Sequence, residues 1–374
     1  MKLKQLTTRI AIFSALLGLH AQAAPFMAVG DNAELFVTAA VALRSDDNIY
    51  LDPTAEVSDT IYSFTPGLDL VFGKGSITKG NLYYREEIRR YSNNDNQDTE
   101  LSNVGFRSDY DNGVTKADFN ASYAQVAQND NNVRATGVIV QRQLTNLGAK
   151  GEFTISEKTS LAVGIMLSNT NYNPVAYTDS SIVSLPIDVY YRTDPKLSWS
   201  LGYAYRSTNL GGGGNDSNDN FLNIGARGEF TPKLTGQIRL GYTQRSFDVG
   251  GDQSLFGFNG SLAYQLSDKT SYQVNGSNDF GSSGYGDSTK NFSLGFSANS
   301  KISEQWAFNG GLSYRRSQYA RRTDDFVEGL LAVTYALNNT VNFGASYTYR
   351  NNSSSAAGLD FTNSVFSLGA NVRY

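Results

Sequence analysis

Arginine is the residue of this chain whose type and spacing could do chemistry. Seven arginines lie on the polar side of segments in which large apolar and small polar residues alternate. They are Arg107, Arg206, Arg227, Arg239, Arg245, Arg315 and Arg350. Each guanidinium offers forked hydrogen-bond donors to a carboxylate or phosphate, so a row of them could attract anions.

Two other roles for these arginines stay open. Lys150, Glu152, Glu229 and Glu328 fall on the same side of their segments, and the carboxylates among them could pair with the arginines. Arginines near the outer ends of segments could instead bind lipid phosphates at a membrane surface.

The first 23 residues have the three parts of a secretory signal. Lysines and an arginine supply a positive start, residues 10–19 are apolar, and Ala21-Gln22-Ala23 is typical of a cleavage site. The apolar stretch is too short for a spanning helix. We therefore expect residues 1–23 to be removed and residues 24–374 to form one domain.

The inventory of side chains argues against enzymatic chemistry. The chain has no cysteine, and its one histidine, His20, lies in the predicted signal. Histidine is the commonest general base, and zinc sites nearly always recruit histidine or cysteine. We expect a protein that is not an enzyme and that holds no cofactor and no metal.

Composition is consistent with a membrane barrel. Gly, Tyr and Phe are plentiful, at 36, 23 and 21 residues, whereas only 7 are Pro. Small residues suit a curved sheet, and aromatic residues suit the interface girdles of a barrel. The formal charge of −4 becomes about −7 once the signal is removed, which argues against a nucleic-acid partner.

In segments from residue 35 to the end, large apolar residues alternate with small or polar ones at every second position. The strands that this pattern predicts must position the arginines. In residues 197–206, Leu197, Trp199 and Leu201 alternate with small polar residues, and residues 306–315 and 341–350 repeat the pattern. This is the period of strands with two different faces.

The connections alternate between short turns and longer polar loops such as 211–220, 281–289 and 351–360. The short turns recur roughly every 36 residues. They cover residues 156–159, 193–196, 231–233, 267–270, 303–305 and 338–340. Short periplasmic turns and long outer loops are typical of an outer-membrane barrel.

The pattern predicts an all-β fold: a transmembrane antiparallel up-and-down barrel of about eighteen strands in the outer membrane of a Gram-negative bacterium. The expected strand starts are Glu34, Ile61, Lys79, Leu101, Val114, Gln143, Ser160, Ser181, Leu197, Asn220, Leu234, Ser254, Thr270, Asn291, Gln305, Phe326, Val341 and Thr362. Residues 138–140 could belong to an extra strand or to a large loop. A surface β-sandwich is the rival fold, but its apolar face would be richer in compact aliphatic residues.

The last strand predicts a partner. One face carries Phe366, Leu368, Ala370, Val372 and the terminal Tyr374. This looks like the signal that the barrel assembly machinery recognises.

The loops hold weaker signals. Asp- and Asn-rich residues 93–98, 129–132 and 215–220 could bind calcium, but they lack EF-hand spacing, which favours solvated loops. Residues 211–214 are glycines with no phosphate-binding lysine after them, which favours a flexible tip.

Residues 46–51 (DDNIYL), 58–70 (SDTIYSFTPGLDL) and 82–91, which include Arg85 and Tyr91, resemble the opening signature of the putative β-barrel porin type 2 family. Members often accompany exopolysaccharide or capsule gene clusters. The resemblance implies a barrel that passes a polysaccharide outward with a periplasmic polysaccharide export protein. Within this stretch, Pro66 and Gly67 could bend a strand, and residues 45–58 could fold into the channel or form an outer hairpin.

Three functions follow as hypotheses. The first is passive export of an extracellular or capsular polysaccharide through a lumen lined in part by arginines, in a barrel surrounded by lipid and lipopolysaccharide. The second is a general or substrate-specific porin for small solutes. The third is a structural or adhesive surface barrel whose loops do the binding.

Overall fold

The computed structural model describes residues 24–133, 137–173 and 176–374. The predicted signal, residues 1–23, lies outside them. The described residues form nineteen strands and two short 3-10 turns, η2 (Asp95–Gln97) and η3 (Gly211–Gly213). The strands are β1 (Met27–Val29), β2 (Ala33–Asp46), β3 (Asp59–Phe72), β4 (Thr78–Tyr91), β5 (Thr99–Asp111), β6 (Thr115–Ala127), β7 (Gln141–Thr154), β8 (Thr159–Tyr172), β9 (Ser180–Asp194), β10 (Leu197–Leu210), β11 (Ser217–Thr231), β12 (Leu234–Phe247), β13 (Gln253–Ser267), β14 (Thr270–Ser282), β15 (Ser288–Lys301), β16 (Trp306–Gln318), β17 (Thr323–Ala336), β18 (Val341–Ser354) and β19 (Phe361–Arg373).

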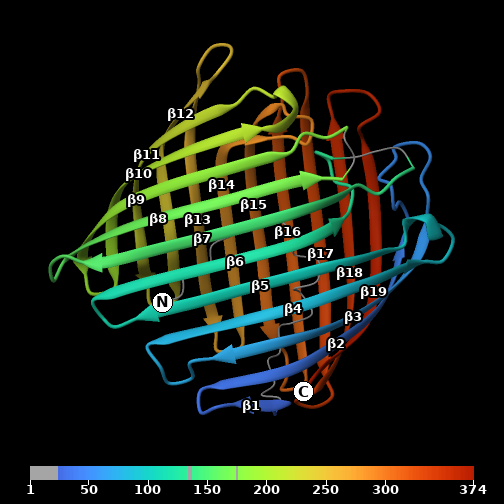
Figure 1. Cartoon of the computed structure of the whole chain (residues 1–374), viewed down its shortest axis with the longest axis horizontal. Helices are drawn as coiled ribbons and strands as arrows, with labels where there is room; N and C mark the ends of the chain where they lie inside the picture. Colours follow the sequence, from blue (N-terminus) through green and yellow to red (C-terminus); the bar gives the residue numbers. More distant parts are fainter. Residues whose placement is uncertain (1–23, 134–136, 174–175) are drawn as a thin grey trace.

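The sheet closes on itself (Figure 1). Each strand from β2 to β19 pairs antiparallel with the next, and β19 pairs back with β2 from Val365↔Asp46 to Arg373↔Thr38. The short β1 pairs with β2 at residues 33–35, beyond the reach of β19. The result is a closed barrel of eighteen strands, in which each strand from β2 to β19 is paired on both sides.

The predicted strands agree with the structure in number and place. Each of the eighteen expected starts falls within three residues of an observed one. The largest differences are at β11, β15 and β17, which begin three residues before the predicted starts. The first residues of these strands are polar, so they pair with the neighbouring strand but do not show the alternation of apolar and polar residues that the prediction relied on. Residues 138–140 lie in a loop rather than in an extra strand, and β1 was not predicted.

The outward face is apolar. Leu201, Leu222, Ile224 and Leu312 each expose more than half of their surface, whereas small or polar residues alternate with them on the inner side. Such a continuous apolar band suits hydrocarbon rather than water. Among the described residues, no helix is long and apolar enough to cross a bilayer.

Pro66 interrupts one ladder, as expected. Pairing between β3 and β4 passes from Phe64↔Ile88 to Gly67↔Arg85 and skips the two residues between. A Cβ at Gly67 would lie 2.6 Å from the backbone oxygen of Tyr84. Glycine is therefore required there by close approach of the neighbouring strand.

Candidate functional site

Side chains of the inner face contact one another across several strands. Arg227 on β11 binds Glu152 on β7, and Arg206 on β10 binds Asp279 on β14. Because three strands separate the partners in each pair, these contacts must run over the concave side of the wall. This places the four side chains on the lumen face.

The lower network joins two arginines, two carboxylates and a tyrosine. Arg227 forms a two-pronged bond with Glu152, one arm of which measures 2.9 Å, and its guanidinium carbon lies 3.3 Å from the centre of the Tyr190 ring. Arg239 donates to Asp188 at 2.7 Å and to the Tyr190 hydroxyl at 2.9 Å. Hydrogen-bonded charges of this kind hold a fixed geometry.

Small residues on the intervening strands let these long side chains lie along the wall. On β8 and β10 the inner positions beside the network are Ala162, Ser200 and Gly202, and all three are buried. A larger residue at any of them would push the charged side chains toward the channel axis. The alternation of small and large residues in the sequence therefore sets where the charges lie.

The upper network centres on one carboxylate. Asp219 accepts from Arg245 at 2.6 and 2.8 Å and from Arg206 Nε at 2.6 Å. Arg206 also binds Asp279 at 2.7 Å, and Arg245 donates to the Ser288 hydroxyl at 2.9 Å. Arg245 and Asp219 are each only 2% exposed, so this network is part of the wall.

Two further predicted arginines bind carboxylates. Arg350 bonds Glu328 at 2.9 Å, and Arg107 bonds Asp109 at 2.9 Å. Six of the seven arginines are thus paired with acids, and the seventh, Arg315, binds a loop asparagine. That these seven arginines attract anions stays a prediction.

Sequence analysis missed inner charges on the early strands. Arg44 and Arg89 both bind Glu87, and Arg85 binds Asp69. The alternation of these residues with outward Tyr84 and Ile88 could have identified β4 as a charged inner row. Glu229, considered as a partner for the arginines, binds Lys196 in a turn instead.

A loop crosses the outer mouth of the barrel. We call residues 128–140, between β6 and β7, the crossing loop. Its Asn131 accepts a hydrogen bond from Arg315 on β16, and its Asn132 accepts one from Tyr319 just beyond β16. Since β16 lies nine strands from β7 in a ring of eighteen, the described part of the loop reaches the opposite wall.

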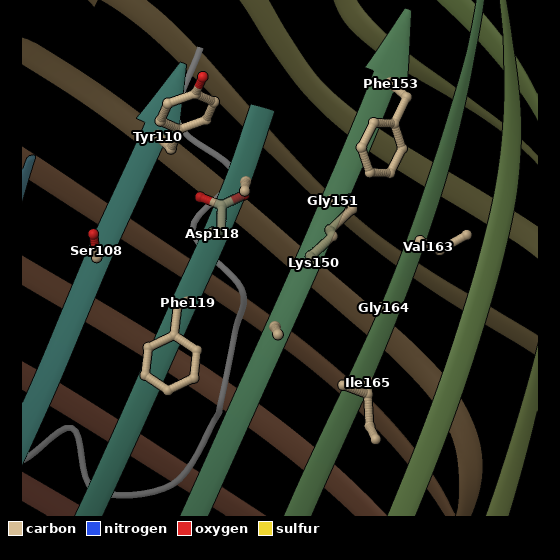
Figure 2. Close-up of a pocket in the computed structure, with 12 residues that line it drawn as sticks. Ser108, Tyr110, Asp118, Phe119, Lys150, Gly151, Phe153, Val163, Gly164 and Ile165 are labelled. Atoms are coloured by element: carbon tan, nitrogen blue, oxygen red, sulfur yellow. The ribbon is translucent and has the colours of Figure 1, made fainter. Parts of the chain in front are cut away.

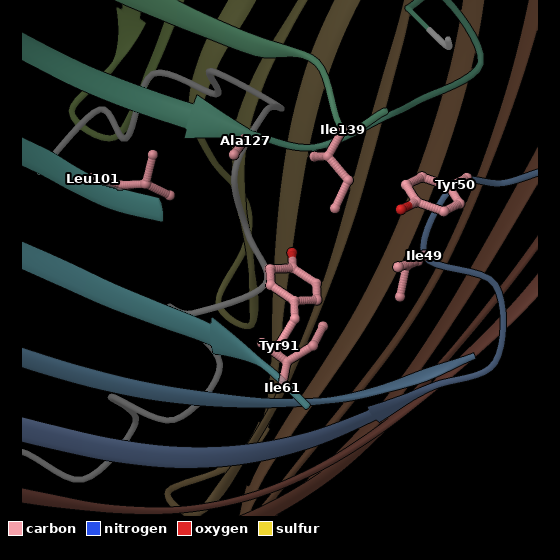
Figure 3. Packing of buried hydrophobic residues seen from close by; sticks show 7 residues of the cluster. All are labelled: Ile49, Tyr50, Ile61, Tyr91, Leu101, Ala127 and Ile139. Carbon is pink, nitrogen blue, oxygen red and sulfur yellow. The ribbon is translucent and has the colours of Figure 1, made fainter. Parts of the chain in front are cut away.

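Two apolar clusters anchor the loops that narrow the mouth. In the first, Ile49 and Tyr50 from residues 47–58 meet Ile139 of the crossing loop above Tyr91 and Ile61 (Figure 3). Residues 47–58 of the stretch 45–58 are therefore folded inward rather than into an outer hairpin, whereas residues 45 and 46 belong to β2.

The second cluster joins the crossing loop to two other outer loops. It contains Val133, Val140 and Tyr177, with Tyr172 packed against it. The rings of Tyr177 and Tyr285 lie 5.3 Å apart. Burial, followed by the charge of Tyr285, raises the pKa of Tyr177.

One stretch of four strands in the lumen wall differs from the strands before it. Strands β13 to β16 carry neutral hydrogen-bonding groups at most inner positions, in contrast to the ion pairs of β2 to β12. Ser277 and Ser293 hydroxyls lie 2.7 Å apart there, and Gln273 donates to Asn275 and Ser261. These four strands offer amides and hydroxyls but few charges to a solute.

A hollow on the outside of the barrel does not belong to the channel. It holds about 590 Å³ over β5 to β8, and its lining includes Ala117 and Ala149. Figure 2 shows the rings of Phe119 and Phe153 on either side of Gly151. Nine of the twelve residues that line the hollow have the parity of the lipid-facing side, and the other three, Asp118, Lys150 and Gly164, have the parity of the inner face. Hydrocarbon chains of the bilayer fill such a hollow.

The fold and lumen define an integral outer-membrane barrel of the porin class. Two related family models match the chain, "Putative beta-barrel porin 2" at residues 202–374 and "Putative beta-barrel porin-2, OmpL-like" at residues 126–274. Together the two matches span residues 126–374, and over this part the chain is similar to these putative β-barrel porin 2 families. The matched residues lie downstream of the stretch 46–91 that carries the resemblance in the sequence.

Several solved structures are similar to the chain at low identity. OpdK of Pseudomonas aeruginosa, solved with vanillate, is 9% identical with a TM-score of 0.47, and the match covers 91% of this chain and 99% of that one. OccAB2 of Acinetobacter baumannii is 11% identical with a TM-score of 0.48, over 92% and 98% of the chains. OccK2 of P. aeruginosa, solved with glucuronate, is 10% identical with a TM-score of 0.49, over 91% and 98%. None of the curated proteins compared matches the chain.

Proposed function

We propose that this protein is a porin through which small hydrophilic solutes diffuse passively. The contact of Asn131 with Arg315 carries the proposal, because it places a loop across the mouth. A polymer leaving the cell would have to displace that loop and both apolar clusters. A small solute needs only the space beside them, so the geometry favours the small-solute alternative over polysaccharide export.

The lining supports the same conclusion. Barrels of sixteen to eighteen strands enclose an aqueous channel. Ion pairs that lie along the wall keep its surface polar while leaving few lone charges to trap a solute. Rapid passage requires such weak binding.

Liposome swelling with sugars of increasing size tests the proposal. Purified protein in vesicles should admit monosaccharides and disaccharides but exclude long dextrans, and empty vesicles are the control. Equal swelling rates for a long dextran and a monosaccharide would overturn the size limit. No swelling with any sugar would overturn the channel itself.

A clean deletion of the gene separates the two transport hypotheses. We expect surface polysaccharide to be unchanged in the deletion strain, whereas uptake of small solutes should fall. Loss of surface polysaccharide, restored by complementation, would contradict the porin proposal and support polysaccharide export with a periplasmic partner.

A further inference from the structure

Lys150 differs from the other inner cations of the lower network. Arg227 and Arg239 each bind a carboxylate. Lys150 makes no hydrogen bond or ion pair with the part of the chain that the structure describes. It is partly buried, and the charges of Arg239 and Arg227 act on it, followed by those of Asp188 and Glu152. It is the one cation of this group with its donors still available.

The backbone register explains why Lys150 lacks a partner. Its neighbour on β8 is Gly164, which has no side chain. Its neighbour on β6 is Asp118, whose carboxylate is turned toward Arg107 at 3.8 Å. Glu152, two residues along the strand, is held by Arg227.

Strands β13 to β16 carry neutral side chains at the middle of their inner face. Inner positions in the middle of β13 to β16 include Asn259, Gln273, Ser297 and Asn309, all neutral. A cation whose donors are not taken up by a carboxylate gives a polar channel a local preference for anions. Amides and hydroxyls on the facing wall can exchange hydrogen bonds with hydroxyl groups of a solute.

We propose that Lys150 binds the anionic group of a small hydroxylated organic acid as it crosses the lumen. The proposal rests on the porin function above and names the solute class of that channel. The lysine ammonium supplies three donors and one charge. The paired arginines position the wall around it and do not contact the solute.

Single-channel recording in planar bilayers tests the proposal. Under a potassium chloride gradient, the wild type should prefer chloride over potassium, and gluconate added on one side should reduce the chloride current. Lys150→Gln should lower the permeability ratio and raise the half-blocking gluconate concentration, each about threefold, as for a solvated ion pair. Lys150→Arg should retain the preference.

Lys158→Gln is the matched control, because it removes the same charge from the turn of the same hairpin. If Lys150→Gln behaves like this control in a conducting channel, the lysine site is wrong and the porin function stands. If the wild type does not conduct, the porin function fails first. Heat-shifted electrophoretic mobility confirms that each variant is folded.

Discussion

Arg245 and Asp219 form a two-pronged ion pair within the barrel wall, with nitrogen to oxygen distances of 2.6 and 2.8 Å. Both side chains are almost fully enclosed. Asp219 is also shared with Arg206. One carboxylate therefore binds a buried arginine and a partly buried one that it shares with Asp279, and we expect the wall to depend on it more than on either arginine.

Replacing Asp219 with asparagine should destabilise the barrel by about 3 kcal/mol, because a buried cation loses its counter-charge. Guanidinium unfolding in vesicles measures this free energy. The control is Asp279→Asn, whose side chain is about half exposed, and we expect it to cost less than about 1 kcal/mol. Equal losses of unfolding free energy in the two variants would show that Asp219 does not stabilise the wall more than Asp279 does.

Releasing the crossing loop should widen the mouth. Asn131→Ala removes its bond to Arg315, and we expect larger and noisier single-channel currents together with entry of larger sugars. Asn215→Ala, which removes hydrogen bonds to Val249 in the neighbouring outer loop, should leave both properties unchanged. Currents identical to the wild type in both variants would show that the contact does not limit passage.

A charge on the outward face should be costly. Ile224 is 63% exposed near the middle of β11, and Ile224→Arg should cost about 2–4 kcal/mol if this face meets hydrocarbon. Asn275→Arg on the inner face of β14 is the comparison and should cost much less. A small loss at both positions would mean that Ile224 does not face lipid.

Alkaline pH should loosen the outer mouth. Burial raises the pKa of Tyr177 above the ordinary tyrosine value of about 10. Because the folded state holds this proton more tightly, the stabilisation is complete below about pH 10 and declines as pH rises beyond it. Channel currents should therefore increase above about pH 10, and Tyr177→Phe should reduce that increase. If the current of the Tyr177→Phe variant rises with pH as much as that of the wild type, groups other than Tyr177 cause the rise.

The terminal aromatic tests the predicted assembly signal. Tyr374 packs edge-on against Phe26 at 6.3 Å, and its N–H bonds Val37. Tyr374→Ala should reduce folded protein in cells far more than folding of the purified chain into vesicles. Equal reductions would mean that the residue acts through packing alone and not through the assembly machinery.

Local pattern was sufficient to predict the strands. Alternation in residues 197–206 and the short turns depend only on neighbours in the chain, and the strand period is fixed by backbone geometry. Side-chain parity follows from the same pattern, so the inner positions of Arg206 and Arg227 could be derived from the sequence. The irregular β1 has too few residues for a pattern.

Tertiary structure alone decided which inner charges are paired and which loops close the mouth. Glu152 and Arg227 lie 75 residues apart in the chain, and Asn131 and Arg315 lie 184 apart. Such contacts depend on how the barrel curves and on the space left by small residues such as Ala162. The sequence by itself determined an outer-membrane barrel with a polar lumen, because alternation is local; closure of the ring decided the partners, because it brings distant strands face to face.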